Sequence, residues 1–134
     1  MNPEARRKKI LIADDDPAIR EILATQLKRL QYDAVTAADG AEAVAAFKSE
    51  KPDLVILDIM MPGLDGFHAC EKMRASEKKG ARVPILFLTA RDSPHDQLSS
   101  AISGGDEFIA KPIGLLELQE RVEAALARAK ARRC

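Results

Sequence analysis

Short apolar runs divide the chain into a repeating pattern. The runs 9–13, 54–57 and 83–88 are rich in Ile, Val and Leu and offer almost no polar side chain to water. Short, unbroken runs of this kind are typical of strands covered on both faces, as in a parallel sheet. The segments 33–37 and 107–110 are also predicted to be strands, and the more polar 33–37 is expected nearer a sheet edge.

Segments with helical spacing of apolar residues follow each of these strands. A capping residue followed by proline marks two helix starts, at Asp16-Pro17 and Ser93-Pro94, and Gly104-Gly105 ends the second of these helices. Asp39 and Glu42 have the spacing of a capping box, and another helix is expected from about 66 to 75, with Asp65 as its cap. The residues expected on inward faces are Ile19, Ile22, Leu23, Leu27, Leu30, Val44, Phe47, Cys70, Met73, Leu98, Ile102, Leu115, Leu118, Val122 and Leu126.

The strict alternation of strand and helix defines the fold class. It predicts an α/β, (βα)5 fold in three layers, with a central five-stranded parallel sheet between helices and right-handed crossovers. The length of 134 residues fits one domain, 1–134. Its core is expected at about 9–128, with basic tails at both ends of the chain.

Composition narrows the possible environments and partners. Lys plus Arg and Asp plus Glu each number 21, so the overall charge favours neither a nucleic acid nor a membrane surface as a direct partner. No apolar run approaches the roughly 20 residues needed to cross a bilayer. The chain has 2 cysteines, Cys70 and Cys134, which do not form a disulfide framework, so a reduced, cytoplasmic protein is expected.

Polar side chains follow four of the predicted strands at the point where each strand ends. Asp14 and Asp15 follow the first, Asp58 the third, Thr89 the fourth and Lys111 the fifth. Because parallel strands end at one edge of a sheet, these groups are expected to converge there. Crowded carboxylates repel one another unless a positive charge is close by. The arrangement therefore predicts a site for a hard divalent cation such as Mg²⁺ and, through it, a phosphoryl group.

Four motifs at these strand ends, taken together, resemble the receiver domain of two-component response regulators. They are Ile10-Leu-Ile-Ala-Asp-Asp-Asp-Pro17, Leu57-Asp-Ile-Met-Met-Pro-Gly-Leu-Asp-Gly66, Leu88-Thr-Ala90 and Phe108-Ile-Ala-Lys-Pro112. Each motif alone is modest, but all four in order are specific, and the resemblance covers nearly the whole chain. It implies the flavodoxin-like strand order 2-1-3-4-5, for which a protein of this family is a standard example.

The resemblance also implies a role for each residue of the site. Asp58 would be the phospho-acceptor, and its carboxylate would attack phosphorus to give an acyl phosphate. Asp15, Asp58 and the backbone carbonyl of Met60 would bind Mg²⁺ directly, with Asp14 acting through a water molecule. Lys111 would pair first with Asp58 and then with the phosphoryl oxygens.

Further implied residues would pass the phosphorylation event to the surface. Thr89 would hydrogen-bond the phosphoryl group, and Phe108 stands where the family has its switch aromatic. The Lys111-Pro112 bond is at the position of the family's cis peptide, which X-Pro bonds adopt at low cost. The output would be a change in the surface formed by the fourth helix, the fifth strand and the last helix.

The resemblance implies partners rather than an external substrate. A sensor histidine kinase or a phosphotransfer protein would donate the phosphoryl group, and the first helix would contribute to the docking face. A downstream protein or an output domain would read the state. The surface of the fourth helix, fifth strand and last helix would be the dimer interface. The domain would catalyse its own phosphorylation and dephosphorylation, without turnover of an external substrate.

Other functions remain open on the sequence alone. A phosphatase with an aspartyl nucleophile needs a second acid two residues on, where this chain has Met60. A flavin-binding flavodoxin would place a phosphate where Asp14 and its neighbours would repel it. The letters Gly104-Gly-Asp-Glu-Phe108 match a diguanylate cyclase signature but fall at a helix end and a strand start, so we interpret them as coincidence. A receiver-like interaction module that is not regulated by phosphorylation is the main alternative.

Overall fold

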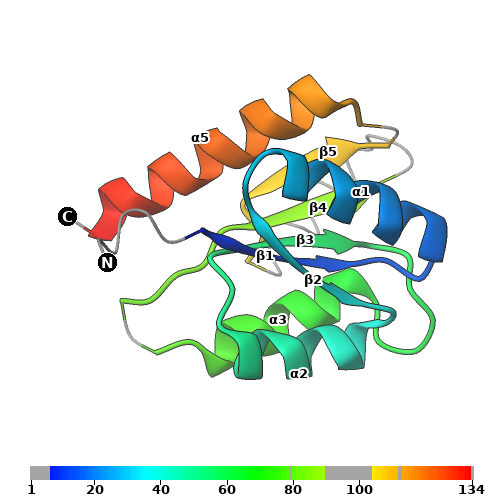
Figure 1. Cartoon of the computed structure of the whole chain (residues 1–134). Helices are drawn as coiled ribbons and strands as arrows, with labels where there is room; N and C mark the ends of the chain where they lie inside the picture. The colour runs from blue at the N-terminus through cyan, green and yellow to red at the C-terminus, as the bar shows by residue number, and fades with distance from the viewer. Residues whose placement is uncertain (1–6, 79, 90–103, 112, 134) are drawn as a thin grey trace.

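The computed structural model describes residues 7–78, 80–89, 104–111 and 113–133 (Figure 1). Predicted features on the other residues, including the fourth helix with Leu98 and Ile102, lie outside the described residues. The strands and helices are β1 (Lys9–Ala13), α1 (Pro17–Arg29), β2 (Asp33–Ala37), α2 (Gly40–Glu50), β3 (Leu54–Asp58), α3 (Gly66–Ser76), β4 (Ile85–Thr89), β5 (Glu107–Ala110) and α5 (Leu115–Arg133).

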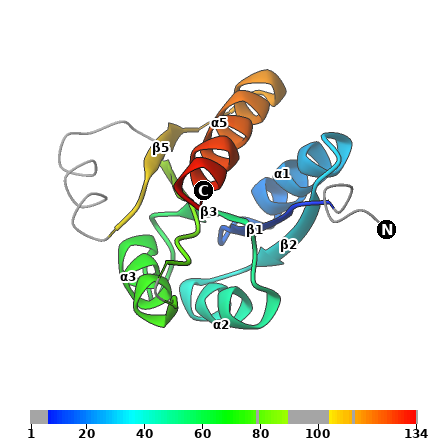
Figure 2. The ribbon, with the colours of Figure 1, turned by 90° about the vertical axis from the view of Figure 1, so that its left-hand side faces the viewer.

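The strands form one parallel sheet in the order β2-β1-β3-β4-β5. Helices α1 and α5 cover one face of this sheet, and α2 and α3 cover the other, as Figures 1 and 2 show. Strand β3 lies at the centre, and all its residues are buried. The predicted fold class and strand order are therefore confirmed, and β2 lies at an edge as its polar residues suggested.

The apolar runs are unbroken because each central strand contributes side chains to two hydrophobic cores, one on each face of the sheet. Alternate residues of a strand point to opposite faces of the sheet. In β3, Val55 and Leu57 pack with α2 and α3, whereas Leu54 and Ile56 pack with α1 and α5. Burying this apolar surface on both faces is the main favourable contribution to folding, and it holds the strand ends in fixed positions.

The helix starts that face the functional edge are capped by aspartates. Asp16, Asp39 and Asp65 accept backbone hydrogen bonds from Ala18, Glu42 and His68, respectively. Each bond satisfies an amide that the first helical turn leaves without a partner. These aspartates therefore act as caps, as predicted from the sequence for all three.

Two sequence predictions about boundaries and faces are wrong. Strand β4 begins at Ile85 rather than Val83, because the Val83 amide donates to Glu77 Oε2 and its carbonyl accepts from Arg74. Ile22 was expected on the inward face of α1, but 52% of it is exposed. It lies at the margin of the apolar stripe, while Leu23 and Leu27 occupy its buried centre.

An arginine links the chain segments at the opposite end of the sheet from the strand-end aspartates. Arg74, near the end of α3, donates to Gly104 O at 2.8 Å and to Asp106 Oδ2 at 2.7 Å. Asp106 also accepts from the Ile85 amide, and Glu107 pairs with two arginines of α5. The acidic letters of the cyclase-like signature are thus engaged in ion pairs where β5 begins.

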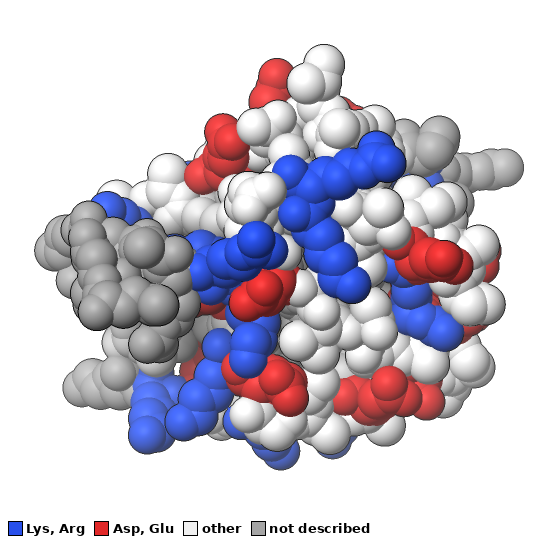
Figure 3. Space-filling view, in the orientation of Figure 1, with Lys and Arg blue, Asp and Glu red and all other residues white. Residues whose placement is uncertain are grey.

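Charge on the surface is mixed. Acidic and basic side chains are interspersed on the face shown in Figure 3. In the part of the chain that the structure describes, no helix is both long enough and apolar enough to span a bilayer.

Gly66 opens α3 directly against the strand end that carries Asp58. A β-carbon at this position would lie 2.3 Å from the backbone oxygen of Asp58. Gly66→Ala is expected to lower the free energy of unfolding by about 1–3 kcal/mol, because only backbone movement can relieve the overlap. Urea denaturation measures the change, with Gly114→Ala as the control because a β-carbon at Gly114 would meet no atom within 4 Å. Equal losses in the two variants would contradict this reading.

Candidate functional site

The turn after β1 supplies two of the carboxylates. Asp14 is fully buried, its amide donates to Ala37 O at 3.2 Å, and its Oδ1 accepts from the Asp16 amide at 2.9 Å. Asp15, the next residue, is exposed. The turn therefore directs one acidic side chain into the molecule and leaves the other accessible from outside.

The third carboxylate stands at the end of the central strand. Asp58 is 4% exposed, and the backbone amide of Met60 donates to its carboxylate. The Ile59 amide bonds Leu88 O at 3.2 Å, and the Gly66 amide bonds Ile59 O at 2.9 Å, so the backbone beyond Asp58 is held on two sides. This carboxylate is consequently presented from a rigid position.

Lys111 brings a positive charge to the two buried carboxylates. Its Nζ lies 2.9 Å from Asp14 Oδ2 and 3.3 Å from Asp58 Oδ1. The Lys111 amide bonds Thr89 O at 2.7 Å, which places the ends of β4 and β5 side by side. Thr89 is itself buried at the end of β4. The predicted convergence at one edge is therefore confirmed for the groups of β1, β3 and β5, with Thr89 on the adjacent strand end.

The three aspartates form an acidic cluster of the kind that binds a metal ion. One ligand oxygen each from Asp14, Asp15 and Asp58 lies within 4.8 Å of the others. Within the described chain, the contact that the buried Asp14 Oδ2 makes is its ion pair with Lys111. A set of carboxylate oxygens with spare acceptor capacity suits a hard divalent cation.

Burial and charge shift the protonation equilibria at this edge. The pKa of Asp58 rises from its ordinary value of 3.8 to about 6, because burial and the neighbouring Asp14 disfavour the charged form more than Lys111 and the Met60 amide favour it. Burial alone would lower the pKa of Lys111, but its close pairing with Asp14 and the charge of Asp58 outweigh this and raise it. At neutral pH the site therefore holds an ionised Asp58 beside a protonated lysine.

The other residues named from the sequence have more varied surroundings. Phe108 on β5 is half-buried and packs on Phe87, with ring centroids 5.9 Å apart. The Met60 side chain is 80% exposed, beside the acidic cluster. Pro112 lies outside the described residues, so the Lys111-Pro112 bond stays a prediction.

Sequence reasoning missed one residue of this edge, Arg20. It lies in α1, and its Nη1 donates to the backbone carbonyl of Asp14 at 2.7 Å. The only signal in the sequence was an arginine in the first turns of a helix that follows an acidic turn. That position on a helix more often faces solvent, so the pattern did not single it out.

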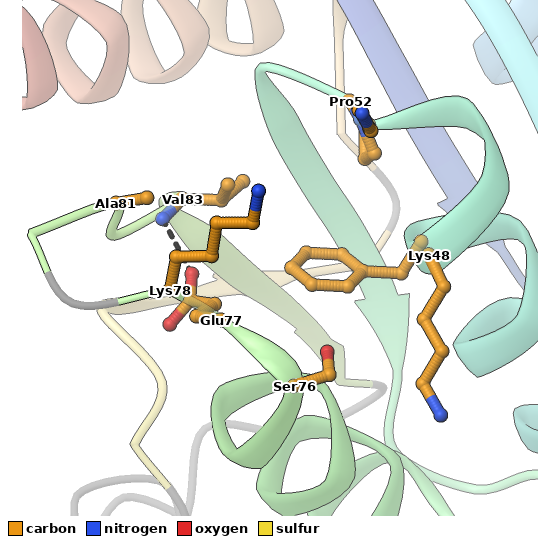
Figure 4. Close-up of a pocket in the computed structure, with 9 residues that line it drawn as sticks. Lys48, Pro52, Ser76, Glu77, Lys78, Ala81 and Val83 are labelled. Atoms are coloured by element: carbon orange, nitrogen blue, oxygen red, sulfur yellow. Dashed lines mark hydrogen bonds between the residues drawn. The ribbon is translucent and has the colours of Figure 1, made fainter.

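A hollow of about 330 Å³ lies away from the acidic cluster, where the C-terminal ends of α2 and α3 meet the segment before β4. Figure 4 shows Lys48 and Lys78 on opposite sides of it, and the Glu77 carboxylate bonded to the Val83 amide. Glu77 is also paired with Arg74 at 3.0 Å. Its acidic group is thus already engaged, and the hollow lacks the convergence of carboxylates found at the strand ends.

Comparison with known proteins identifies the family. Residues 10–123 match the response regulator receiver domain. The probable transcriptional regulator ycf27 of Porphyridium aerugineum is 43% identical over 123 residues, which are 92% of this chain and 50% of that protein. The chain spans about half the length of the curated relatives it matches.

Solved structures agree with this assignment. Chemotaxis protein CheY4 of Vibrio cholerae superposes with a TM-score of 0.85 at 29% identity, over 90% of this chain and 99% of that one. The receiver domain of sensor histidine kinase PA1611 from Pseudomonas aeruginosa has a TM-score of 0.82 at 30% identity, over 91% and 99% of the two chains. That structure has a magnesium ion coordinated in its active site cleft. The present chain belongs to the response regulator receiver domain family of two-component signalling, a regulatory module rather than an enzyme that turns over an external substrate.

Because the pKa of Asp58 is raised in the folded state, the free energy of unfolding should depend on pH. Between about pH 4 and pH 6 the folded state binds more protons than the unfolded state, so stability falls as the pH rises through this window. Asp58→Asn removes this cost and is expected to raise the free energy of unfolding at pH 7.5 by about 1–3 kcal/mol, since one pKa unit is worth about 1.4 kcal/mol.

Urea unfolding in EDTA at pH 7.5 and at pH 4.5 measures the difference between the two proteins. The gain from Asp58→Asn should shrink at pH 4.5, where the carboxyl is protonated in the folded state. If Asp58→Asn is less stable than the parent at pH 7.5, the ionised Asp58 carboxylate does not lower the stability of the folded protein, and the prediction is wrong.

Proposed function

We propose that Asp58 accepts a phosphoryl group from a histidine kinase and that the domain signals through this modification. The observation that carries the proposal is the position of the Lys111 ammonium group, in contact with both Asp14 and Asp58. A nucleophilic carboxylate, neighbouring carboxylates suited to a cation, and a lysine at hydrogen-bonding range are the groups that phosphoryl transfer to an aspartate requires.

Each residue has a defined part in the proposed reaction. An oxygen of Asp58 attacks phosphorus in line with the leaving group, which keeps the bonding electrons as the acyl phosphate forms. Asp15, Asp58 and the carbonyl of Met60 would hold Mg²⁺, and Asp14 would bind one of its waters. Mg²⁺ when bound would balance the charge of the carboxylates and of the phosphoryl oxygens. Lys111 moves its hydrogen bond from Asp58 to a phosphoryl oxygen.

The response is proposed to travel through β4 and β5. Thr89 would hydrogen-bond the new phosphoryl group, and Phe108 would change its packing in turn. Phe108 contacts the fully buried Phe87 on one side and is itself half-buried, so it has both a core position and a path toward the surface. The surface that changes would comprise the predicted fourth helix, β5 and α5.

The partners follow from the family. A two-component receiver works with a histidine kinase, and we propose that this one takes its phosphoryl group from such a kinase or from a phosphotransfer protein in the cytoplasm. A downstream protein, an output domain in a longer protein, or a second copy of the chain would read the result. Direct binding to nucleic acid by this domain is not part of the proposal, because its acidic and basic residues balance at 21 each.

Phosphorylation at Asp58 is tested with a small phosphodonor and Mg²⁺. The intact mass should rise by one phosphoryl group, Asp58→Asn should abolish the rise, and EDTA should prevent it. Asp65→Asn is the matched control, because it changes a nearby aspartate whose role is to cap α3 and asparagine caps equally well. Labelling that persists in Asp58→Asn would move the acceptor elsewhere. A folded parent protein that is never labelled would favour an interaction module independent of phosphorylation.

A further inference from the structure

Arg20 holds the turn that carries the acidic cluster. Its side chain is half-buried and reaches back along α1, and its Nη1 donates to the carbonyl oxygen of Asp14 at 2.7 Å. Hydrogen bonds from a charged donor are stronger than neutral ones. This contact is therefore a firm anchor at the point where β1 passes into α1.

The carbonyl oxygen of Asp14, held by Arg20, determines the orientation of the peptide plane between Asp14 and Asp15. The carbonyl of Asp14 and the amide of Asp15 belong to one planar peptide unit, so fixing the oxygen fixes the orientation of the plane that leads to the Asp15 Cα. The register of β1 against β2 and β3 ends at Ala13, one residue earlier. The Asp14 amide still donates to Ala37 O of β2, and Arg20 holds the next peptide unit, between Asp14 and Asp15.

The side chain of Asp15 depends on this anchoring more than its neighbours do. Asp14 is fully buried and has its own contacts with the Asp16 amide and Lys111. Asp15 is exposed, so packing does not constrain its carboxylate. The position of its carboxylate within the cluster is consequently set mainly by the backbone of the turn.

We propose that Arg20 is a positioning residue for the cation site, acting through the carbonyl of Asp14. The inference rests on the proposed function, in which Asp15 is a metal ligand. Electrostatics and positioning predict opposite signs for the loss of Arg20. Its positive charge repels a cation, so its removal would tighten binding if charge alone mattered. Removal would weaken binding if holding the turn matters more.

Titration of the 134-residue chain with MgCl₂, followed by amide shifts in NMR spectra, separates these outcomes. The dissociation constant for Mg²⁺ should rise about tenfold in Arg20→Gln, at the lower end of the effect of removing groups that orient metal ligands. Arg20→Lys keeps the charge and one donor, and is expected to weaken binding by less than Arg20→Gln does. Arg29→Gln, on the last turn of the same helix, should leave the constant unchanged.

Three results decide the matter. An unchanged or lower dissociation constant in Arg20→Gln would overturn the inference while leaving the proposed function in place. A parent protein that shows no Mg²⁺-dependent shifts would overturn the proposed function as well. A purely structural role would lower the melting temperature but leave Mg²⁺ affinity of the folded protein intact. If Arg20→Gln does not fold, Arg20→Lys decides, and affinity equal to that of the parent overturns the inference.

Discussion

The contact of one ammonium group with two buried carboxylates is the interaction on which the functional edge depends. Lys111 lies against Asp14 and Asp58, and these groups come from three strands that are far apart in the chain. Burial disfavours the charged form of a carboxylate unless a positive charge is close by. The lysine only partly compensates, since the pKa of Asp58 still rises to about 6. That residual imbalance is what an incoming divalent cation can relieve.

The fold makes this unfavourable grouping possible. Burial of β1, β3 and β4 on both faces fixes these strands, and the residues at their ends are therefore held in place. The start of α3 packs directly against the backbone of Asp58, because Gly66 has no β-carbon to overlap with the Asp58 carbonyl oxygen. The favourable burial of apolar side chains in the two cores therefore offsets the unfavourable grouping of charges at the strand ends.

The sequence predicted most of this arrangement because its signals are local. Short apolar runs identify buried strands, and parallel strands must end together, so Asp58 and Lys111 could be brought to one edge without coordinates. What it did not predict depends on bonds between individual side chains and the backbone of a neighbouring turn or segment, which residue patterns do not encode. Val83 leaves the sheet because groups from α3 and the residue after it bind its backbone. Ile22 and Arg20 share one helix, yet one faces outward and the other turns back to the acidic turn. Helical spacing alone does not distinguish such choices.

The most direct test of the central claim is a crystal structure of the chain grown with Mg²⁺ at a resolution that reveals the ion's ligands. We expect one ion bound by the carboxylates of Asp15 and Asp58 and by the Met60 carbonyl, with Lys111 still in contact with Asp58. An ion bound elsewhere on the molecule, or a Lys111 side chain turned away from the two aspartates, would contradict this expectation.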